Sequence, residues 1–158
     1  MSEYRPDTTQ FNVGDARFAI IAARWNGNIT DPLLAAAEQT LADHGVASNA
    51  VESFRVPGAF ELPLAAQQAA QSGRFDAVIA LGCVIRGDTP HFDYVCAETT
   101  RGIGEVSLQS QLPVGFGLLT TDDLRQAQLR SSDNEENKGR EAALTVLEMI
   151  TALKAIKG

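Results

Sequence analysis

The chain has 158 residues, the length of one ordinary domain with a hydrophobic core of its own. Its hydrophobic content of 44% and charged content of 21% are typical of a globular protein. Thirteen basic and 20 acidic residues give a formal net charge of −7, which argues against nucleic acid or an anionic membrane as the main partner. A phosphate site in such a chain must therefore be a local cluster of positive groups.

The N-terminal segment of residues 1–15 is polar and has no apolar stretch like that of a secretory signal. No apolar run approaches the roughly 20 residues that a membrane helix needs. The two cysteines, Cys83 and Cys96, are too few for a disulfide framework, and their spacing does not indicate a metal site. We therefore expect a cytoplasmic protein without a bound metal, in which an N-terminal arm (1–15) precedes a single domain (16–158).

Apolar patterns and turn residues predict four strands and five helices along the chain. The first strand, Phe18–Ala23, is apolar throughout, as expected where both faces of a sheet are covered. Asp31 and Pro32 suit the N-cap and first residue of the helix that follows, and Gly45 ends it. The predicted strands are 18–23, 50–56, 76–82 and 114–120, and the predicted helices are 32–44, 60–72, 90–111, 122–129 and 138–156.

Strands and helices alternate strictly in this prediction. Because crossover connections between parallel strands are right-handed, such alternation produces a parallel sheet with helices on its faces. The predicted fold class is α/β: a three-layer, flavodoxin-like sandwich with a four-stranded parallel sheet flanked by helices. In open sheets of this kind, ligands bind beyond the carboxyl ends of the strands.

Residues that suit ligand binding follow the first two predicted strands. Trp25 comes directly after the first strand, where an indole can stack on a planar ring; a place in the core is the alternative. After the second strand, the amides of Gly58 and Ala59 can hold hydroxyls or carbonyls, with Glu61 as an acceptor. A plain turn followed by a helix-favouring acid explains the same residues, and the local pattern favours that alternative.

The segment Leu81–Phe92 is the most informative part of the sequence. A buried strand leads into the turn Gly87–Thr89, and Pro90 and His91 open a helix. Free backbone N–H groups at a helix N-terminus bind anions, so this segment predicts a site for a phosphorylated small molecule. A neutral imidazole at His91 can move protons at physiological pH, whereas helix capping explains the other histidine, His44.

Positive candidates for a phosphate site lie farther along the chain. Arg130 ends the predicted short helix, and Lys138 begins the last helix. Arginine and lysine together can hold phosphate, but arginine near a helix C-terminus also interacts favourably with the helix dipole, and both explanations stay open. Cys83 and Cys96 are interpreted as buried side chains without a chemical role.

Five motifs in a fixed order carry a resemblance to a known enzyme family. They are Trp25–Thr30 (WNGNIT), Val56–Pro63 (VPGAFELP), Leu81–Phe92 (LGCVIRGDTPHF), Pro113–Thr120 (PVGFGLLT) and Asn137–Gly139 (NKG). In this order and at this spacing, the chain resembles the lumazine synthase (6,7-dimethyl-8-ribityllumazine synthase) family. The resemblance covers essentially the whole chain after the N-terminal arm.

The resemblance implies the penultimate step of riboflavin biosynthesis, a condensation that needs no cofactor. The amine of 5-amino-6-(D-ribitylamino)uracil attacks the ketone of 3,4-dihydroxy-2-butanone 4-phosphate, and an imine forms. Phosphate then leaves, and the ring closes with loss of water to give 6,7-dimethyl-8-ribityllumazine. Because the imine joins the two substrates, the protein supplies positioning and proton transfer rather than a nucleophile.

The resemblance also assigns roles to residues in the matching motifs, with His91 as the proton shuttle. The implied substrate-binding residues are Trp25 on the pyrimidine, Ala59, Phe60 and Glu61 on the ribityl chain, Val84 and Ile85 beside the ring, Gly87, Asp88, Thr89 and Arg130 on the phosphate, and Phe116 and Lys138 at the adjoining subunit or the rim. Asp88 departs from the family, in which several members have a small residue at this position.

A homo-oligomer, at least a pentamer with sites between neighbouring subunits, is the implied assembly, and riboflavin synthase is a candidate protein partner. Ser131 and Ser132 stand where many shell-forming members have a glycine, and acidic residues follow at positions 133, 135 and 136. These features favour a free pentamer over an icosahedral shell. Because fold alone does not set function, the alternatives are a flavin- or nucleotide-binding protein and a shell-forming paralogue without strong catalysis.

Overall fold

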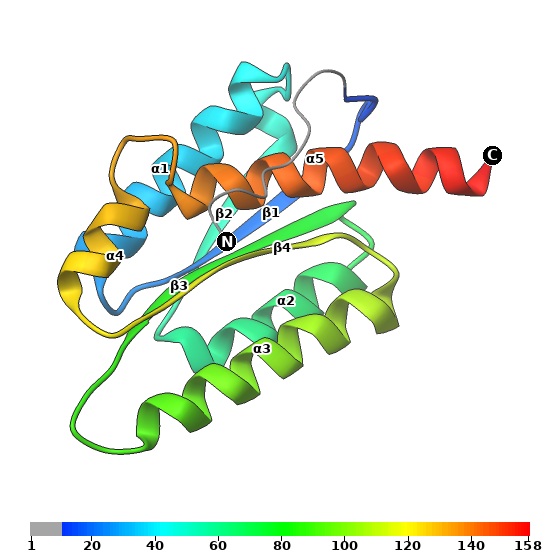
Figure 1. Cartoon of the computed structure of the whole chain (residues 1–158). Coiled ribbons are helices and arrows are strands. Elements are labelled where there is room, and N and C mark those ends of the chain that lie inside the picture. Colours follow the sequence, from blue (N-terminus) through cyan, green and yellow to red (C-terminus); the bar gives the residue numbers. More distant parts are fainter. Residues whose placement is uncertain (1–10) are drawn as a thin grey trace.

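A computed structural model describes residues 11–158, in which strands and helices alternate along the chain (Figure 1). The strands are β1 (Phe18–Ala23), β2 (Val51–Val56), β3 (Ala77–Ile85) and β4 (Val114–Thr121). The helices are α1 (Gly27–Asp43), α2 (Leu62–Gln71), α3 (His91–Ser110), α4 (Leu124–Ser131) and α5 (Lys138–Lys157), with 3-10 turns η1 (Ser48–Ala50) and η2 (Ala59–Glu61).

The four strands form one parallel sheet in the order β2-β1-β3-β4. Helices α1, α4 and α5 cover one face of this sheet, and α2 and α3 cover the other (Figure 1). The predicted α/β fold class, with a four-stranded parallel sheet between two helical layers, is confirmed. The strand order is that of the flavodoxin-like class without its fifth strand.

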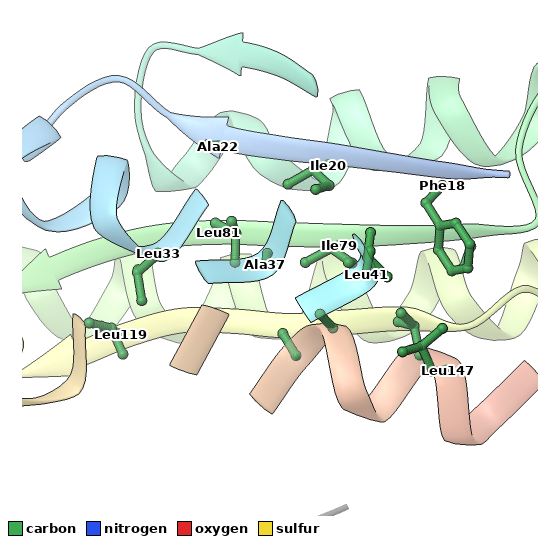
Figure 2. Close-up of a cluster of buried hydrophobic side chains, with 14 of the residues drawn as sticks. Phe18, Ile20, Ala22, Leu33, Ala37, Leu41, Ile79, Leu81, Leu119 and Leu147 are labelled. Carbon is green, nitrogen blue, oxygen red and sulfur yellow. The ribbon is translucent and has the colours of Figure 1, made fainter. Parts of the chain in front are cut away.

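Both faces of the sheet are buried because side chains alternate along each strand. Phe18 and Ile20 point into the cluster beneath α1 and α5, to which Leu147 also belongs (Figure 2). Ala19 and Ile21 point into the opposite cluster beneath α2 and α3. All six residues of β1 are at most 1% exposed, which explains why this strand is apolar throughout.

The described end of the predicted N-terminal arm contacts its own domain. The Asn12 amide donates a hydrogen bond to Thr151 Oγ1 of α5 at 2.8 Å. The Phe11 ring meets the His44 ring edge-on at a centroid distance of 5.1 Å, and His44 itself caps the end of α1. Residues 1–10 of the predicted arm lie outside the described residues.

Helix α1 begins four residues before Asp31, so the predicted N-cap at Asp31 is wrong. Its N-cap is Asn26, whose carbonyl accepts hydrogen bonds from the amides of Ile29 and Thr30, both at 2.9 Å. Asp31 instead forms an ion pair with Arg55 of β2, and Pro32 lies inside the helix. A contact between distant parts of the chain therefore overrides the local capping signal.

Other predicted boundaries also shift by a few residues. Strand β3 continues three residues past Gly82, since Val84 and Ile85 pair with β4. Helix α4 starts later than predicted, because Asp123 caps it by accepting a hydrogen bond from the Gln126 amide at 2.8 Å. The predicted helix 60–72 is divided into the 3-10 turn η2 and the shorter helix α2.

The close contact between α1 and α5 requires glycine at position 139. A Cβ atom there would lie 2.0 Å from the backbone oxygen of Leu33, which no side-chain rotation can relieve. We expect Gly139→Ala to lower the free energy of unfolding by about 1–3 kcal/mol or more, as overpacking does. The matched control is Gly104→Ala on α3, where a Cβ meets nothing within 4 Å and helix propensity predicts a gain of up to about 1 kcal/mol. Chemical denaturation of both variants at one protein concentration measures the effect, and equal stabilities would contradict the close contact.

Candidate active site

The sheet has its topological switch point between β1 and β3. From β1 the chain proceeds to β2 on one side and later returns through β3 on the other, so the loops after β1 and β3 diverge. Such divergence leaves a crevice beyond the carboxyl ends of the strands. A cavity of about 660 Å³ occupies this place. It is lined by Trp25, Asn26, Ala59, Phe60, Glu61, Cys83, Val84, Ile85, His91, Tyr94, Val95 and Glu98.

The Trp25 side chain lies at the surface of this cavity and not in the core. It is 57% exposed, so the core alternative for this residue is wrong. Its amide donates a hydrogen bond to the Pro57 carbonyl at 2.9 Å, which joins the ends of β1 and β2. A Cβ at Gly58 would lie 2.3 Å from the indole, so glycine is needed for Trp25 to take this position.

The turn after β2 is the plain turn followed by an acidic residue that the sequence offered as the alternative to a ligand site. The Gly58 amide donates a hydrogen bond to Glu61 Oε2 at 2.9 Å. This amide, one of the two that the sequence offered as ligand donors, is therefore bonded within its own chain. Ala59, Phe60 and Glu61 nevertheless line the cavity, and Phe60 is 57% exposed.

Asn26 joins the two sides of the crevice and was missed as a cavity residue. Its backbone is left-handed (φ 57°, ψ 46°), a conformation that asparagine tolerates better than most residues. Its Nδ2 donates a hydrogen bond to the Cys83 carbonyl at 3.0 Å. The side chain therefore links the loop after β1 to the end of β3.

Cys83 also lines the cavity, while its side chain is only 5% exposed. Burial, together with the nearby Cys96, raises the pKa of the Cys83 thiol to about 11. The thiol is therefore protonated at neutral pH and is a poor nucleophile. Cys96 is half-buried, so the prediction that both cysteines are fully buried is wrong for this one.

One face of α3 supplies four of the lining residues. His91 opens the helix, and Tyr94, Val95 and Glu98 follow at positions three, four and seven along it. Residues at this spacing share a helix face, so helical periodicity counted from His91 was the signal that could have identified the other three. Glu98 is held by Arg101 (Oε1–Nη2 2.6 Å), and this hydrogen bond lowers the pKa of the carboxyl group.

The loop of Gly87, Asp88 and Thr89 is exposed and leads from β3 into α3, at the lower left of Figure 1. Thr89 Oγ1 accepts a hydrogen bond from the His91 amide at 3.4 Å. The three residues are thus next to His91 in the structure but do not line the cavity themselves.

Phe116, Arg130 and Lys138 do not line the cavity of their own chain. Phe116 lies on the edge strand β4 with 46% of its surface exposed. Arg130 donates a hydrogen bond to the Gln126 carbonyl of its own helix at 3.0 Å, and Lys138 pairs with Glu141 at 2.7 Å. Within one chain, therefore, the structure does not bring these three predicted residues to the others.

The segment after Arg130 forms without a left-handed residue. Ser131 ends α4, and Ser132 is extended (φ −72°, ψ 165°). The Asn137 side chain donates hydrogen bonds to the carbonyls of Ser131 and Ser132 at 2.8 and 3.1 Å. Serine is thus compatible with the backbone of this loop, which needs no glycine at positions 131 and 132.

Two further findings concern the whole of residues 11–158. Within this range, no group of three or more His, Cys, Asp and Glu side chains is arranged to hold a metal ion. No helix in the same range is both long and apolar enough to span a bilayer.

The raised pKa of Cys83 makes stability depend on pH in the alkaline range. Below pH 9.0, the ordinary pKa of a cysteine, the Cys83 thiol is protonated in both the folded and the unfolded state. Between about pH 9 and 11 the thiol loses its proton only in the unfolded state, so the free energy of unfolding falls as pH rises. The expected loss is roughly 2–3 kcal/mol. Cys83→Ala removes this contribution, so the stability difference between wild type and variant should shrink over that range. Denaturation under reducing conditions measures it, and parallel pH profiles would contradict the burial of the thiol.

A comparison with protein families identifies the family of the chain. The family model of 6,7-dimethyl-8-ribityllumazine synthase matches residues 15–154, which include every residue of the cavity and of the β3–α3 loop. This confirms the resemblance seen in the five motifs. The chain therefore belongs to the 6,7-dimethyl-8-ribityllumazine synthase family, which consists of transferases of riboflavin biosynthesis.

Proposed function

We propose that the protein condenses 5-amino-6-(D-ribitylamino)uracil with 3,4-dihydroxy-2-butanone 4-phosphate to 6,7-dimethyl-8-ribityllumazine. The observation that carries this proposal is the cavity at the switch point, where an exposed indole, a carboxylate and an imidazole line one space. Its volume of about 660 Å³ is within the range of small-molecule sites. The family match supports the same reaction.

The pyrimidine and its ribityl chain fit the part of the cavity beneath Trp25. The exposed indole offers a flat apolar face on which a pyrimidine ring can stack. Val84 and Ile85, at the end of β3, supply an apolar wall beside the ring. Ala59, Phe60 and Glu61 approach from η2, and the Glu61 carboxylate can accept hydrogen bonds from ribityl hydroxyls.

The butanone phosphate fits the loop that precedes α3. The amides of this loop and of the first helical turn are suited to an anion, because the N-terminus of a 20-residue helix carries partial positive charge. The Thr89 hydroxyl adds a donor. The Asp88 side chain must point to solvent for this arrangement, which its exposed position allows.

His91 is placed to transfer protons between the two substrate sites. The amine nitrogen attacks the ketone carbon, and imine formation expels the carbonyl oxygen as water. Elimination then releases inorganic phosphate, and ring closure expels a second water. An imidazole at the helix start can accept the proton of the amine and return it to the departing oxygen, while binding supplies most of the remaining catalysis.

We also propose that each site is completed by a neighbouring subunit in a homopentamer. The resemblance implies that Phe116, Arg130 and Lys138 contribute to the site, yet none of them lines the cavity of its own chain. Cyclic symmetry makes all such shared sites equivalent. The exposed Asp133 and Glu135 favour a free pentamer over an icosahedral shell, and the two free cysteine thiols favour a cytoplasmic location.

His91→Ala tests the proton-transfer role. With both substrates saturating, we expect turnover to fall by roughly 10²–10⁴-fold. The uncatalysed condensation makes the observed fall in rate smaller, and the variant should keep its fold. The matched control is His44→Ala, because the other histidine caps α1 and lies away from the cavity. Lumazine formation is followed by its fluorescence.

The same assay separates the proposed reaction from its alternatives. Lumazine formation by the wild-type protein from both substrates supports the proposed condensation. A wild-type protein that binds a flavin or nucleotide but forms no lumazine would instead support the alternative that the protein only binds such a ligand. Turnover of His91→Ala equal to that of wild type would contradict the proton shuttle and leave the reaction itself standing.

Complementation tests the shared site. Arg130→Ala should raise the KM for butanone phosphate much more than that for the pyrimidine, since Arg130 is proposed to bind phosphate. If His91 and Arg130 of one site come from different subunits, co-assembling His91→Ala with Arg130→Ala should restore part of the activity at low butanone phosphate, where both variants are impaired. Each variant assembled alone is the control.

Absence of restored activity in mixed oligomers would show that both residues act within one subunit. Sedimentation of the same samples at moderate salt gives the assembly state. A monomer would contradict the shared site, and a shell-sized particle would contradict only the argument from loop charge.

A further inference from the structure

Arg86 is the first residue after β3 and the first residue of the connection that leads to His91. It was not among the predicted site residues and does not line the cavity. Its side chain nevertheless contacts three residues in two parts of the structure, the first turn of α3 and the residue after β4. These contacts are concentrated at the start of the β3–α3 loop, which leads to His91.

The contacts of Arg86 connect the two ends of the β3–α3 loop with each other and with the end of β4. Its Nη1 lies 3.3 Å from Asp93 Oδ1, and its guanidinium carbon lies 4.3 Å from the centroid of the Phe92 ring, both in the first turn of α3. Its Nε donates to Asp122 Oδ1, after β4, at 2.9 Å. The Arg86 amide also donates to the Thr121 carbonyl at 2.9 Å.

These contacts fix the span between residues 86 and 92. The loop Gly87–Pro90 is exposed, and its described hydrogen bonds join it to the first turn of α3: Thr89 Oγ1 accepts from the His91 amide at 3.4 Å, and the Pro90 carbonyl accepts from the Asp93 amide at 2.9 Å. The positions of Thr89 and His91 therefore depend on how the loop's two ends are held. Phe92, next to His91, is 9% exposed and gives the guanidinium a buried ring to stack on.

We propose that Arg86 is a positioning residue that holds the β3–α3 loop closed and thereby sets the place of His91 and Thr89 at the candidate active site. The proposal rests on the condensation proposed above. It assigns no substrate contact to Arg86; the residue acts through the loop. Misplacing a reacting group by about 1 Å can slow an enzyme on the order of 100-fold.

Arginine is suited to this role because its planar group can meet two carboxylates and stack on a ring together. Lysine is a point charge and cannot copy all three contacts. The hydrogen bond to Asp122 raises the pKa of Arg86, so the guanidinium keeps its charge at any working pH.

Arg86→Ala is the test, with both substrates varied. We expect kcat to fall by roughly 10–100-fold and the KM for butanone phosphate to rise, because His91 and Thr89 lose their fixed position. The KM for the pyrimidine should stay unchanged, since Trp25, Val84 and Ile85 are held by other contacts. Arg86→Lys should recover only part of the activity.

Arg74→Ala is the matched control. Arg74 precedes β3, pairs with Glu52 and lies 4.8 Å over the Phe75 ring, so it has the same kinds of contact at the opposite end of the strand. It does not line the cavity. Its removal should change stability about as much as Arg86→Ala does and leave both kinetic constants at wild-type values.

Two further variants distinguish positioning from direct contact with substrate. Asp122→Ala removes a partner of Arg86 and should reproduce part of the kcat loss. In the His91→Ala background, Arg86→Ala should lower kcat by a smaller factor than in wild type, because residues that act together are not additive.

The outcomes separate this inference from the proposed reaction. An inactive wild-type protein would overturn the reaction. With an active wild type, Arg86→Ala kinetics like those of Arg74→Ala would overturn the positioning role alone. Wild-type kinetics for Asp122→Ala, or fully additive effects of Arg86→Ala and His91→Ala, would also overturn it.

Discussion

The right-handed crossover between parallel strands is the constraint on which the rest of the structure depends. With the order β2-β1-β3-β4, it sends α1 to one face of the sheet and α2 and α3 to the other (Figure 1). The central strands β1 and β3 are then buried on both sides, and their following loops must part. The cavity between these loops is thus a consequence of connectivity, before any side chain is considered.

The residues around this cavity are held mainly by contacts within the chain. Asn26 bonds the end of β3, the Gly58 amide bonds Glu61, and Glu98 is paired with Arg101. Such contacts fix the walls before a ligand arrives, so less freedom is lost on binding. The β3–α3 loop differs, because Arg86 connects its two ends across the gap.

The cavity is open, and its exposed aromatic residues are unusual for a finished site. Trp25 and Phe60 are each 57% exposed, while buried apolar walls are the norm for small-molecule sites. Phe116 on the edge strand is also exposed. An assembly in which neighbours cover these rings accounts for their exposure, and this agrees with the shared site proposed above.

The sequence alone determined the alternation of strands and helices and the grouping of Trp25, Glu61 and His91 at one edge of the sheet, because apolar periodicity and glycine turns are local signals and the carboxyl ends of parallel strands share one edge. Only the tertiary structure decided the start of α1, because the competing partner of Asp31 is on β2, distant in sequence. It likewise decided that the face of α3 shared by His91, Tyr94 and Glu98 meets the cavity, because helical spacing shows which residues share a face while packing sets where that face points.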